Sequence, residues 1–99
     1  MWARVARYEV EPERIDAAIE GFEAASQALL ELRGTEGGYL LVDREDGSAI
    51  TVTFWDSRDA LTASEVAAAG LRRRAMEDAQ GSVASVGVYE VAAEFGSHP

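Results

Sequence analysis

The sequence predicts a single α+β domain in which four strands and two helices follow one another in the order βαββαβ. Three observations favour this fold class. Both ends of the chain alternate apolar and polar residues, as strands do, and the segment after Pro12 repeats its apolar residues every three or four positions, as a helix does. The pair Asp46-Gly47 also stands between two strand-like runs, which is typical of a hairpin.

The first strand and the first helix are predicted within residues 1–34. Met1 to Val10 alternate with period two and are rich in strand-forming residues. Pro12 with an acid on either side fits the first turn of a helix, where a missing N–H is tolerated and negative charge is favoured. Gly34 indicates the end of that helix. We expect its core face to consist of Ile15, Ala18, Ile19, Phe22, Ala25, Leu29 and Leu32.

The middle of the chain predicts a hairpin. Tyr39 to Asp43 and Ala49 to Trp55 read as strands, because apolar and β-branched residues dominate both segments. Asp46-Gly47 between them predicts a tight turn whose two central residues have positive φ.

A second helix is predicted from about Arg58 to Ala79. Asp56 or Ser57 supplies the side-chain oxygen that caps its first turn. Gly70 lies inside this segment and costs about 1 kcal/mol relative to alanine, so we expect a break there. Gly81 ends the helix.

The last strand is predicted over Ser82 to Val91. With right-handed crossovers, the order βαββαβ folds into one four-stranded antiparallel sheet with both helices on one face, the ferredoxin-like arrangement. We expect this domain to span residues 1–95 and residues 96–99 to form a flexible tail that carries the chain's one histidine, His98.

The face of the sheet away from the helices is predicted to be an interface. The first, third and fourth strands offer apolar side chains to both faces, whereas a monomer should carry polar residues on the uncovered one. A large exposed apolar surface usually marks a contact between proteins. We therefore predict a homodimer whose sheets pack face to face; the alternative is that its Thr and Ala residues simply tolerate water.

Charge and composition restrict the partners. The net charge of −9 disfavours nucleic acid and anionic membrane surfaces. The chain has no cysteine, which excludes disulfides and thiolate chemistry, and no apolar run is long enough for a signal peptide or a membrane span. We expect a cytoplasmic protein without a membrane partner.

Three segments carry a family resemblance. VEPERIDAAIEGF (10–22), GGYLLVDREDG (37–47) and above all TFWDSRDALTASE (53–65) resemble the antibiotic biosynthesis monooxygenase family of dimeric α/β-barrel proteins. The resemblance covers about residues 2–95. It implies the dimeric barrel and several possible activities, because the family includes cofactor-free quinone-forming oxygenases, haem-degrading enzymes and small-molecule isomerases.

The haem-degrading activity is disfavoured by the residues present. That branch of the family uses an Asn on the first strand and a Trp and a His in the second helix, and the corresponding positions here are near Ala6, Ser64 and Arg74. These residues do not hold a macrocycle or ligate its iron in the same way. We expect no cofactor, and no metal either, because the acid runs lack the spacing of a metal site.

Catalytic residues stay unassigned at this level. Many family members carry a histidine near the start of the second helix, where this chain has Ser64-Glu65. Acid-base work would then fall on Glu65 or on one of the tyrosines, Tyr8, Tyr39 and Tyr89.

Six residues are candidates for contact with a small aromatic ligand: Arg4, Tyr8, Trp55, Ser64, Arg72 and Tyr89. Trp55 has two interpretations, an aromatic wall for a ligand or a plug where the third strand meets the second helix. We favour the plug, because the residue directly precedes the helix cap and large aromatics dominate small cores.

The arginines among these candidates need partners. Arg4 lies on an otherwise apolar strand face and requires a carboxylate or a ligand anion, for which Glu90 or Glu94 are available. Four-residue spacings pair Arg73 with Glu77 and Arg74 with Asp78, which leaves Arg72 free.

Two functions remain open. One is a cofactor-independent oxygenase that holds a small aromatic or polyketide-like molecule between sheet and helices. The other is a non-catalytic dimeric module that binds a small molecule or another protein and keeps the fold without the enzyme site.

Overall fold

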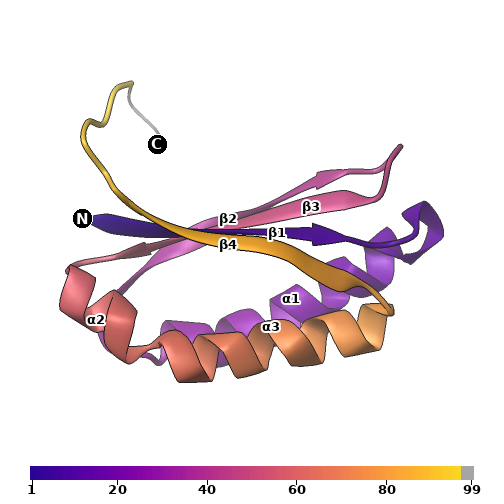
Figure 1. Cartoon of the computed structure of the whole chain (residues 1–99), viewed down its shortest axis with the longest axis horizontal. Coiled ribbons are helices and arrows are strands. Elements are labelled where there is room, and N and C mark those ends of the chain that lie inside the picture. Colours follow the sequence, from indigo (N-terminus) through magenta and orange to yellow (C-terminus); the bar gives the residue numbers. More distant parts are fainter. Residues whose placement is uncertain (97–99) are drawn as a thin grey trace.

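The structure is a computed structural model that describes residues 1–96. It contains one antiparallel sheet of four strands in the order β2-β3-β1-β4, and the long helices cover one face of it (Figure 1). The predicted ferredoxin-like α+β fold is confirmed. Its elements are β1 (Trp2–Glu9), the 3-10 helix η1 (Pro12–Arg14), α1 (Ile15–Leu30), β2 (Thr35–Asp43), β3 (Ser48–Trp55), α2 (Arg58–Ala63), α3 (Glu65–Ala79) and β4 (Ser82–Glu90).

Strand β1 lies at the centre of the sheet and decides which residues face the helices. It pairs antiparallel with β3 on one side and with β4 on the other. Its residues Arg4, Ala6 and Tyr8 are buried beneath the helices, whereas Arg7 and Glu9 are exposed on the other face. The period-two pattern of the sequence therefore corresponds to the two faces of the sheet.

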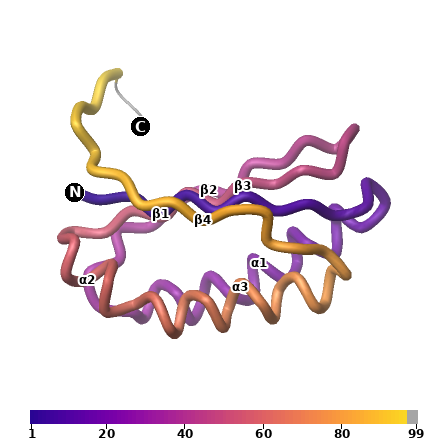
Figure 2. The backbone as a smooth tube through the Cα atoms, viewed as in Figure 1, coloured from indigo at the N-terminus to yellow at the C-terminus, as the bar shows by residue number. Residues whose placement is uncertain are grey.

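The core forms where α1 and α3 lie side by side under the sheet (Figure 2). Its largest fully buried side chains are Trp55, Tyr8 and Ile15. The rings of Tyr8 and Phe22 meet at a centroid distance of 4.8 Å, which joins β1 to α1. Small residues such as Ala18 on α1 allow the two helices and the sheet to approach closely.

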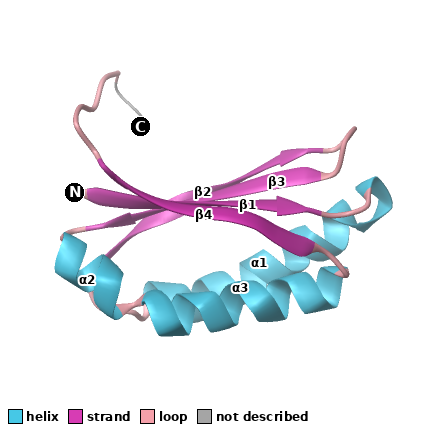
Figure 3. Cartoon of the chain, viewed as in Figure 1, coloured by secondary structure: helices cyan, strands magenta, loops and turns pink. Residues whose placement is uncertain are grey.

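The second helical segment breaks at Ser64, and the predicted break at Gly70 is wrong (Figure 3). Ser57 caps α2 as predicted, since its side chain accepts a hydrogen bond from the Ala60 N–H at 3.1 Å. The Leu61 carbonyl at the end of α2 accepts hydrogen bonds from the Ser64 hydroxyl and from the Arg4 guanidinium. Because these donors occupy the carbonyl that a continuous helix would use, the chain turns here, while Gly70 costs too little to interrupt α3.

The hairpin differs from the prediction in two details. Strand β2 starts at Thr35, four residues earlier than predicted, with a register shift before Gly38. The loop to β3 has four residues, of which Gly47 alone has a positive φ, so the predicted two-residue turn is wrong. The Asp43 carboxylate instead accepts hydrogen bonds from backbone N–H groups of the loop and holds it in shape.

The sheet face away from the helices is apolar and uncovered within the chain. Tyr39 and Phe54 meet on it edge to face at a centroid distance of 6.4 Å. The strand registers place seven larger apolar side chains on this face, which we call the open face: Val5, Tyr39, Leu41, Ile50, Val52, Phe54 and Tyr89. Residues that alternate along the strands therefore point to two faces of the sheet, and both faces carry apolar side chains.

The chain beyond β4 leaves the sheet on the side opposite the helices (Figure 2). The last strand ends at Glu90, one residue before its predicted end. Except for Gly96, the predicted flexible tail, with His98, lies outside the described residues. None of the helices within residues 1–96 has the length and apolar character needed to cross a membrane.

Replacing the buried tryptophan should destabilise the fold strongly. Trp55 is 0% exposed, and we expect Trp55→Ala to lower the free energy of unfolding by about 3–5 kcal/mol. Phe95 is 89% exposed, and Phe95→Ala should change that free energy by less than about 0.5 kcal/mol. Urea denaturation followed by circular dichroism measures both, and equal effects would contradict the assignment of Trp55 as the plug.

Candidate functional site

A cavity of about 380 Å³ lies between the sheet and the two long helices. Its walls are mainly apolar and come from α1, β2 and α3, with Phe22, Ala25, Leu29, Leu40, Ala68 and Leu71 among them. Gly37 and Gly38 of β2 also line it, and Leu30 and Tyr39 at this side are exposed. The volume and the apolar walls are typical of a pocket for a small organic molecule.

Most of the polar groups that line the cavity come from the sheet, and Ser26 and Arg72 come from the helices. Arg4 and Tyr8 reach it from β1, Thr51 and Thr53 from β3, and Arg72 from α3. The Tyr8 and Thr51 hydroxyls share a hydrogen bond of 3.0 Å. The two arginines are the only charged residues among the described residues that line the cavity.

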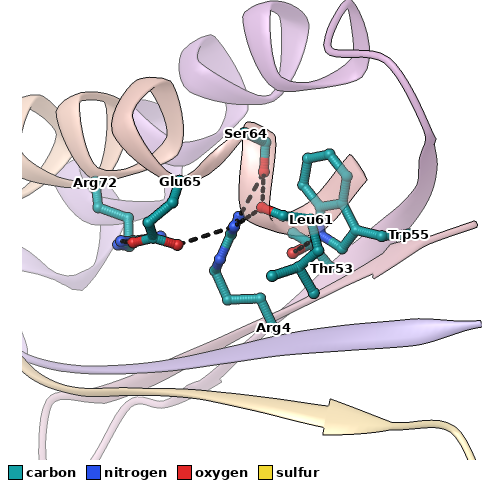
Figure 4. Close-up of polar contacts among 7 residues, drawn as sticks. All are labelled: Arg4, Thr53, Trp55, Leu61, Ser64, Glu65 and Arg72. Carbon is teal, nitrogen blue, oxygen red and sulfur yellow. Dashed lines mark hydrogen bonds and ion pairs between the residues drawn. The ribbon is translucent and has the colours of Figure 1, made fainter. Parts of the chain in front are cut away.

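Arg4 is the most unusual of these groups, because its side chain is only 3% exposed. Its Nη2 donates to the Leu61 carbonyl at 2.8 Å and to the Ser64 hydroxyl at 3.0 Å, and it lies 2.9 Å from Oε2 of Glu65 (Figure 4). All the hydrogen bonds and ion pairs found for this guanidinium within residues 1–96 involve Nη2. Nε is buried and has no hydrogen-bond partner there.

The Trp55 ring packs against the Arg4 guanidinium. The Arg4 Cζ lies 5.2 Å from the centre of a Trp55 ring, within the range of a cation–π contact. The indole N–H donates to the Thr53 hydroxyl at 3.0 Å, so the buried ring has its polar atom satisfied. Trp55 does not line the cavity and is the plug that its sequence position predicts.

The carboxylate partner of Arg4 is Glu65, and the predicted partners Glu90 and Glu94 are wrong. The pairing of β1 with β4 places Val88 beside Arg4 and puts Glu90 opposite Trp2. Glu65 instead reaches Arg4 from the first turn of α3, which the break at Ser64 brings over the sheet.

Glu65 also binds Arg72, which the sequence predicted to be free. Oε1 of Glu65 lies 2.7 Å from Nη2 of Arg72, which stands about two helical turns further along the same face of α3. The ion pairs found within residues 1–96 involve Arg4, Arg44 and Arg72, so the predicted pairs of Arg73 and Arg74 are absent there. One carboxylate is thus shared by two guanidinium groups.

Burial shifts the pKa of two groups at the cavity. Desolvation lowers the pKa of Arg4 below its ordinary value, and the charge of Glu65 acts in the opposite direction. Arg4 stays charged at neutral pH. Burial raises the pKa of the Tyr8 hydroxyl, against weaker opposing effects from the Thr51 hydrogen bond and the two arginines. Tyr8 is therefore a neutral hydrogen-bonding group at physiological pH.

The six predicted ligand residues fall into three groups. Arg4, Tyr8 and Arg72 line the cavity. Ser64 and Trp55 are buried behind Arg4 and hold its guanidinium in place. Tyr89 is 58% exposed on the open face, away from the cavity of its own chain.

Sequence reasoning missed several cavity residues. Thr51 and Thr53 alternate along β3 on the face that turns to the helices, and this spacing was the available signal. Ala25 was predicted only as part of the core face of the first helix and Ala68 was not singled out, although small side chains at core positions leave room for a ligand. Within the described part of the chain, no group of three or more His, Cys, Asp or Glu residues is placed to hold a metal ion.

The model of one protein family matches the chain. It describes antibiotic biosynthesis monooxygenases and covers residues 1–69, from β1 into the first turns of α3. The chain belongs to the antibiotic biosynthesis monooxygenase family. Arg4 and Glu65 lie within the matched segment, and Arg72 lies just beyond it.

This monooxygenase-family chain is similar to one bacterial protein in sequence and to several solved structures in fold. An uncharacterised protein found in two strains of Mycobacterium tuberculosis is 33% identical over 100 residues, and the chain spans 42% of its length. A Deinococcus radiodurans protein described as an antibiotic biosynthesis monooxygenase superposes over 100% of both chains with a TM-score of 0.75 and 15% identity. SnoaB of Streptomyces nogalater, a cofactor-independent oxygenase, superposes over 97% of both chains with a TM-score of 0.73 and 18% identity. At these identities the two structures show a shared fold.

The shifted pKa of Tyr8 should be visible in an alkaline titration. The chain has nine arginines and no lysine, so lysine ionisation does not overlap with that of tyrosine around pH 10. Because Tyr8 ionises less readily when folded, its contribution to stability should be full below about pH 10 and be lost as the pH rises through its raised pKa.

Tyrosinate absorbance should therefore contain one late component, which Tyr8→Phe removes and Tyr89→Phe leaves in place. The free energy of unfolding of Tyr8→Phe should also fall less steeply above about pH 10. A late component that persists in Tyr8→Phe would contradict the assignment.

Proposed function

We propose that this chain is a cofactor-independent oxygenase that holds a small aromatic or polyketide-like molecule in the cavity between its sheet and helices. The observation that carries the proposal is the cavity itself, about 380 Å³ in volume, apolar along the helices and polar at one end. Membership of the monooxygenase family and the shared fold with a cofactor-independent oxygenase support the reaction type.

The charges at the cavity favour a substrate that provides its own carbanion. The charged groups among its described lining residues are Arg4 and Arg72, and the Tyr8 hydroxyl is too weak an acid to supply a base at neutral pH. Two fixed cations in an apolar cavity stabilise negative charge on a nearby oxygen. A substrate with an acidic enol or phenol would therefore ionise more readily when bound, and its proton would pass to solvent.

The reaction itself needs only the substrate and O₂. The carbanion transfers an electron to O₂, and the two radicals combine to form a C–O bond and a peroxide. The peroxide O–O bond then breaks as the same carbon loses its second proton, which leaves a carbonyl group and releases water. In sum, a CH₂ group and O₂ become a C=O group and H₂O, and the protein supplies position and charge.

A second candidate function is ligand binding without chemistry. The observation that favours it is the lining of the cavity, which offers neither histidine nor carboxylate among the described residues to act as a base. Oxygen consumption separates the two candidates.

Filling the cavity should abolish the activity. With anthrone as substrate, we expect oxygen uptake by the wild type and a loss of about 100-fold in Ala25→Phe, whose ring occupies the substrate volume. Ala24→Phe is the matched control, because Ala24 is exposed on the same helix and does not line the cavity. An oxygen electrode measures the rates.

The oxygen-uptake measurements distinguish the oxygenase from the binding module. Absence of uptake in the wild type across a panel of such substrates, with aromatic binding retained, would favour the binding module. Equal uptake by Ala25→Phe and the wild type would place the reaction outside the cavity.

We also propose that two copies of the chain pair through the open face. Its seven larger apolar side chains form one continuous surface across all four strands, which supports a contact with a second sheet. Face-to-face packing would bury this surface from water on both copies. For such a dimer we propose a cytoplasmic location, which a composition without cysteine supports.

A charge on the open face should separate the copies. Leu41 lies on this face and is half exposed in the single chain, so we expect Leu41→Asp to shift a micromolar sample from dimer to monomer. Val66→Asp is the control, since Val66 is 87% exposed on α3, on the other side of the molecule. Analytical ultracentrifugation measures both, and a monomeric wild type would refute the pairing.

A further inference from the structure

The polar end of the cavity has more positive than negative charge. Arg4 and Arg72 contribute two guanidinium groups, and both make their ion pairs with the single carboxylate of Glu65. The cluster therefore carries one positive charge that no group within the described residues neutralises. We propose that this end of the cavity is a subsite for an oxygen group of charge −1 on the ligand, either a carboxylate or an ionised enol or phenol.

The donors of Arg4 support this assignment. A guanidinium has five N–H donors, and the contacts found for Arg4 use Nη2 alone. Nε is buried without a partner, on a side chain that is only 3% exposed. Leaving a charged donor buried and unpaired is costly, so the contacts within the chain do not fully compensate the burial of this guanidinium. Arg4 also lines the cavity, which places its positive charge beside a molecule bound there.

The partly exposed position of Glu65 explains why the positive charge of the two arginines still acts on the cavity. Its side chain is 46% exposed, so water screens its attraction to the two arginines more than it screens their effect on the cavity. Arg72 is 12% exposed and Arg4 less, and both border the apolar space directly. A ligand anion in that space would interact with the arginines in a medium of lower dielectric constant than the one around Glu65.

The acidic surface does not outweigh this local charge. The chain has a net charge of −9, which repels anions at long range. At physiological ionic strength, charges further than about 8 Å apart are largely screened, whereas a buried group within hydrogen-bond distance is not. Close contacts with two guanidinium groups should therefore decide which ligands bind.

The inference rests on the proposed function only in placing the ligand in the same cavity. It predicts that ligand charge controls affinity, whether or not the ligand reacts with O₂. Calorimetric titration with naphthoate and with naphthylmethanol tests this, because the two share the ring system and differ by one negative charge. The wild type should bind naphthoate about 10- to 100-fold more tightly. The same titration with nitronaphthol, an acidic phenol, compares the two ligand types: tighter binding of nitronaphthol than of naphthoate indicates an ionised enol or phenol, and the reverse indicates a carboxylate.

Removing one of the two positive charges and removing the negative charge should shift the affinity for naphthoate in opposite directions. Arg72→Gln removes the surplus charge and should weaken naphthoate binding by about 10- to 100-fold while leaving naphthylmethanol unchanged. Glu65→Gln adds to the surplus and should strengthen naphthoate binding. Arg73→Gln is the matched control, because Arg73 is exposed on the same helix and makes the same change in net charge.

Equal affinity of the wild type for naphthoate and naphthylmethanol would overturn the subsite, as would the absence of naphthoate binding. Shifts in the same direction for Arg72→Gln and Glu65→Gln would also overturn it, because a purely structural role predicts that both variants loosen the site. If Glu65→Gln does not fold, the ligand comparison and Arg72→Gln decide. Charge-selective binding without oxygen uptake would retain the subsite and refute the oxygenase.

Discussion

The burial of one guanidinium organises the functional half of this molecule. Arg4 stands on an inner strand of the sheet, and its cost of burial is offset by groups from α2, from α3 and from the residue that joins them: the Leu61 carbonyl, the Glu65 carboxylate and the Ser64 hydroxyl. The same contacts end α2, start α3 and fix the direction in which α3 crosses the sheet. The path of α3 then determines where Leu71 and Arg72 meet the cavity. A charged residue in the core is thus also the residue that shapes the site.

Much of the fold could be predicted from the sequence because its determinants are local. Alternation along β1 and the cap at Ser57 each depend on a few neighbouring residues, and each was found where the sequence placed it. The hairpin of β2 and β3 was also found, although its turn differs from the predicted one. The break between α2 and α3 could not be predicted in this way. The Leu61 carbonyl at this break accepts a hydrogen bond from Arg4, 57 residues away, as well as one from the nearby Ser64 hydroxyl, and intrinsic propensity pointed instead to Gly70.

The candidate site was less predictable for the same physical reason. Arg4 was recognised as a residue in need of a carboxylate, but the choice between Glu65 and Glu90 depends on strand register and on the direction of α3. The cavity exists where small side chains from two helices line the same space beside the sheet, as Ala25 and Ala68 do. A pattern of apolar residues predicts that a face is buried. It does not predict whether side chains fill the space between two buried faces.

The cavity opens to solvent beside the exposed Leu30 and Tyr39, so water fills it when no ligand is bound. Water finds hydrogen-bond partners near Arg4, Tyr8 and Thr51 but few along the apolar walls of α1 and α3. A molecule that displaces the poorly bonded water with a ring and meets the arginines with an oxygen gains at both ends, which is why the apolar and the charged parts of this cavity belong to one site.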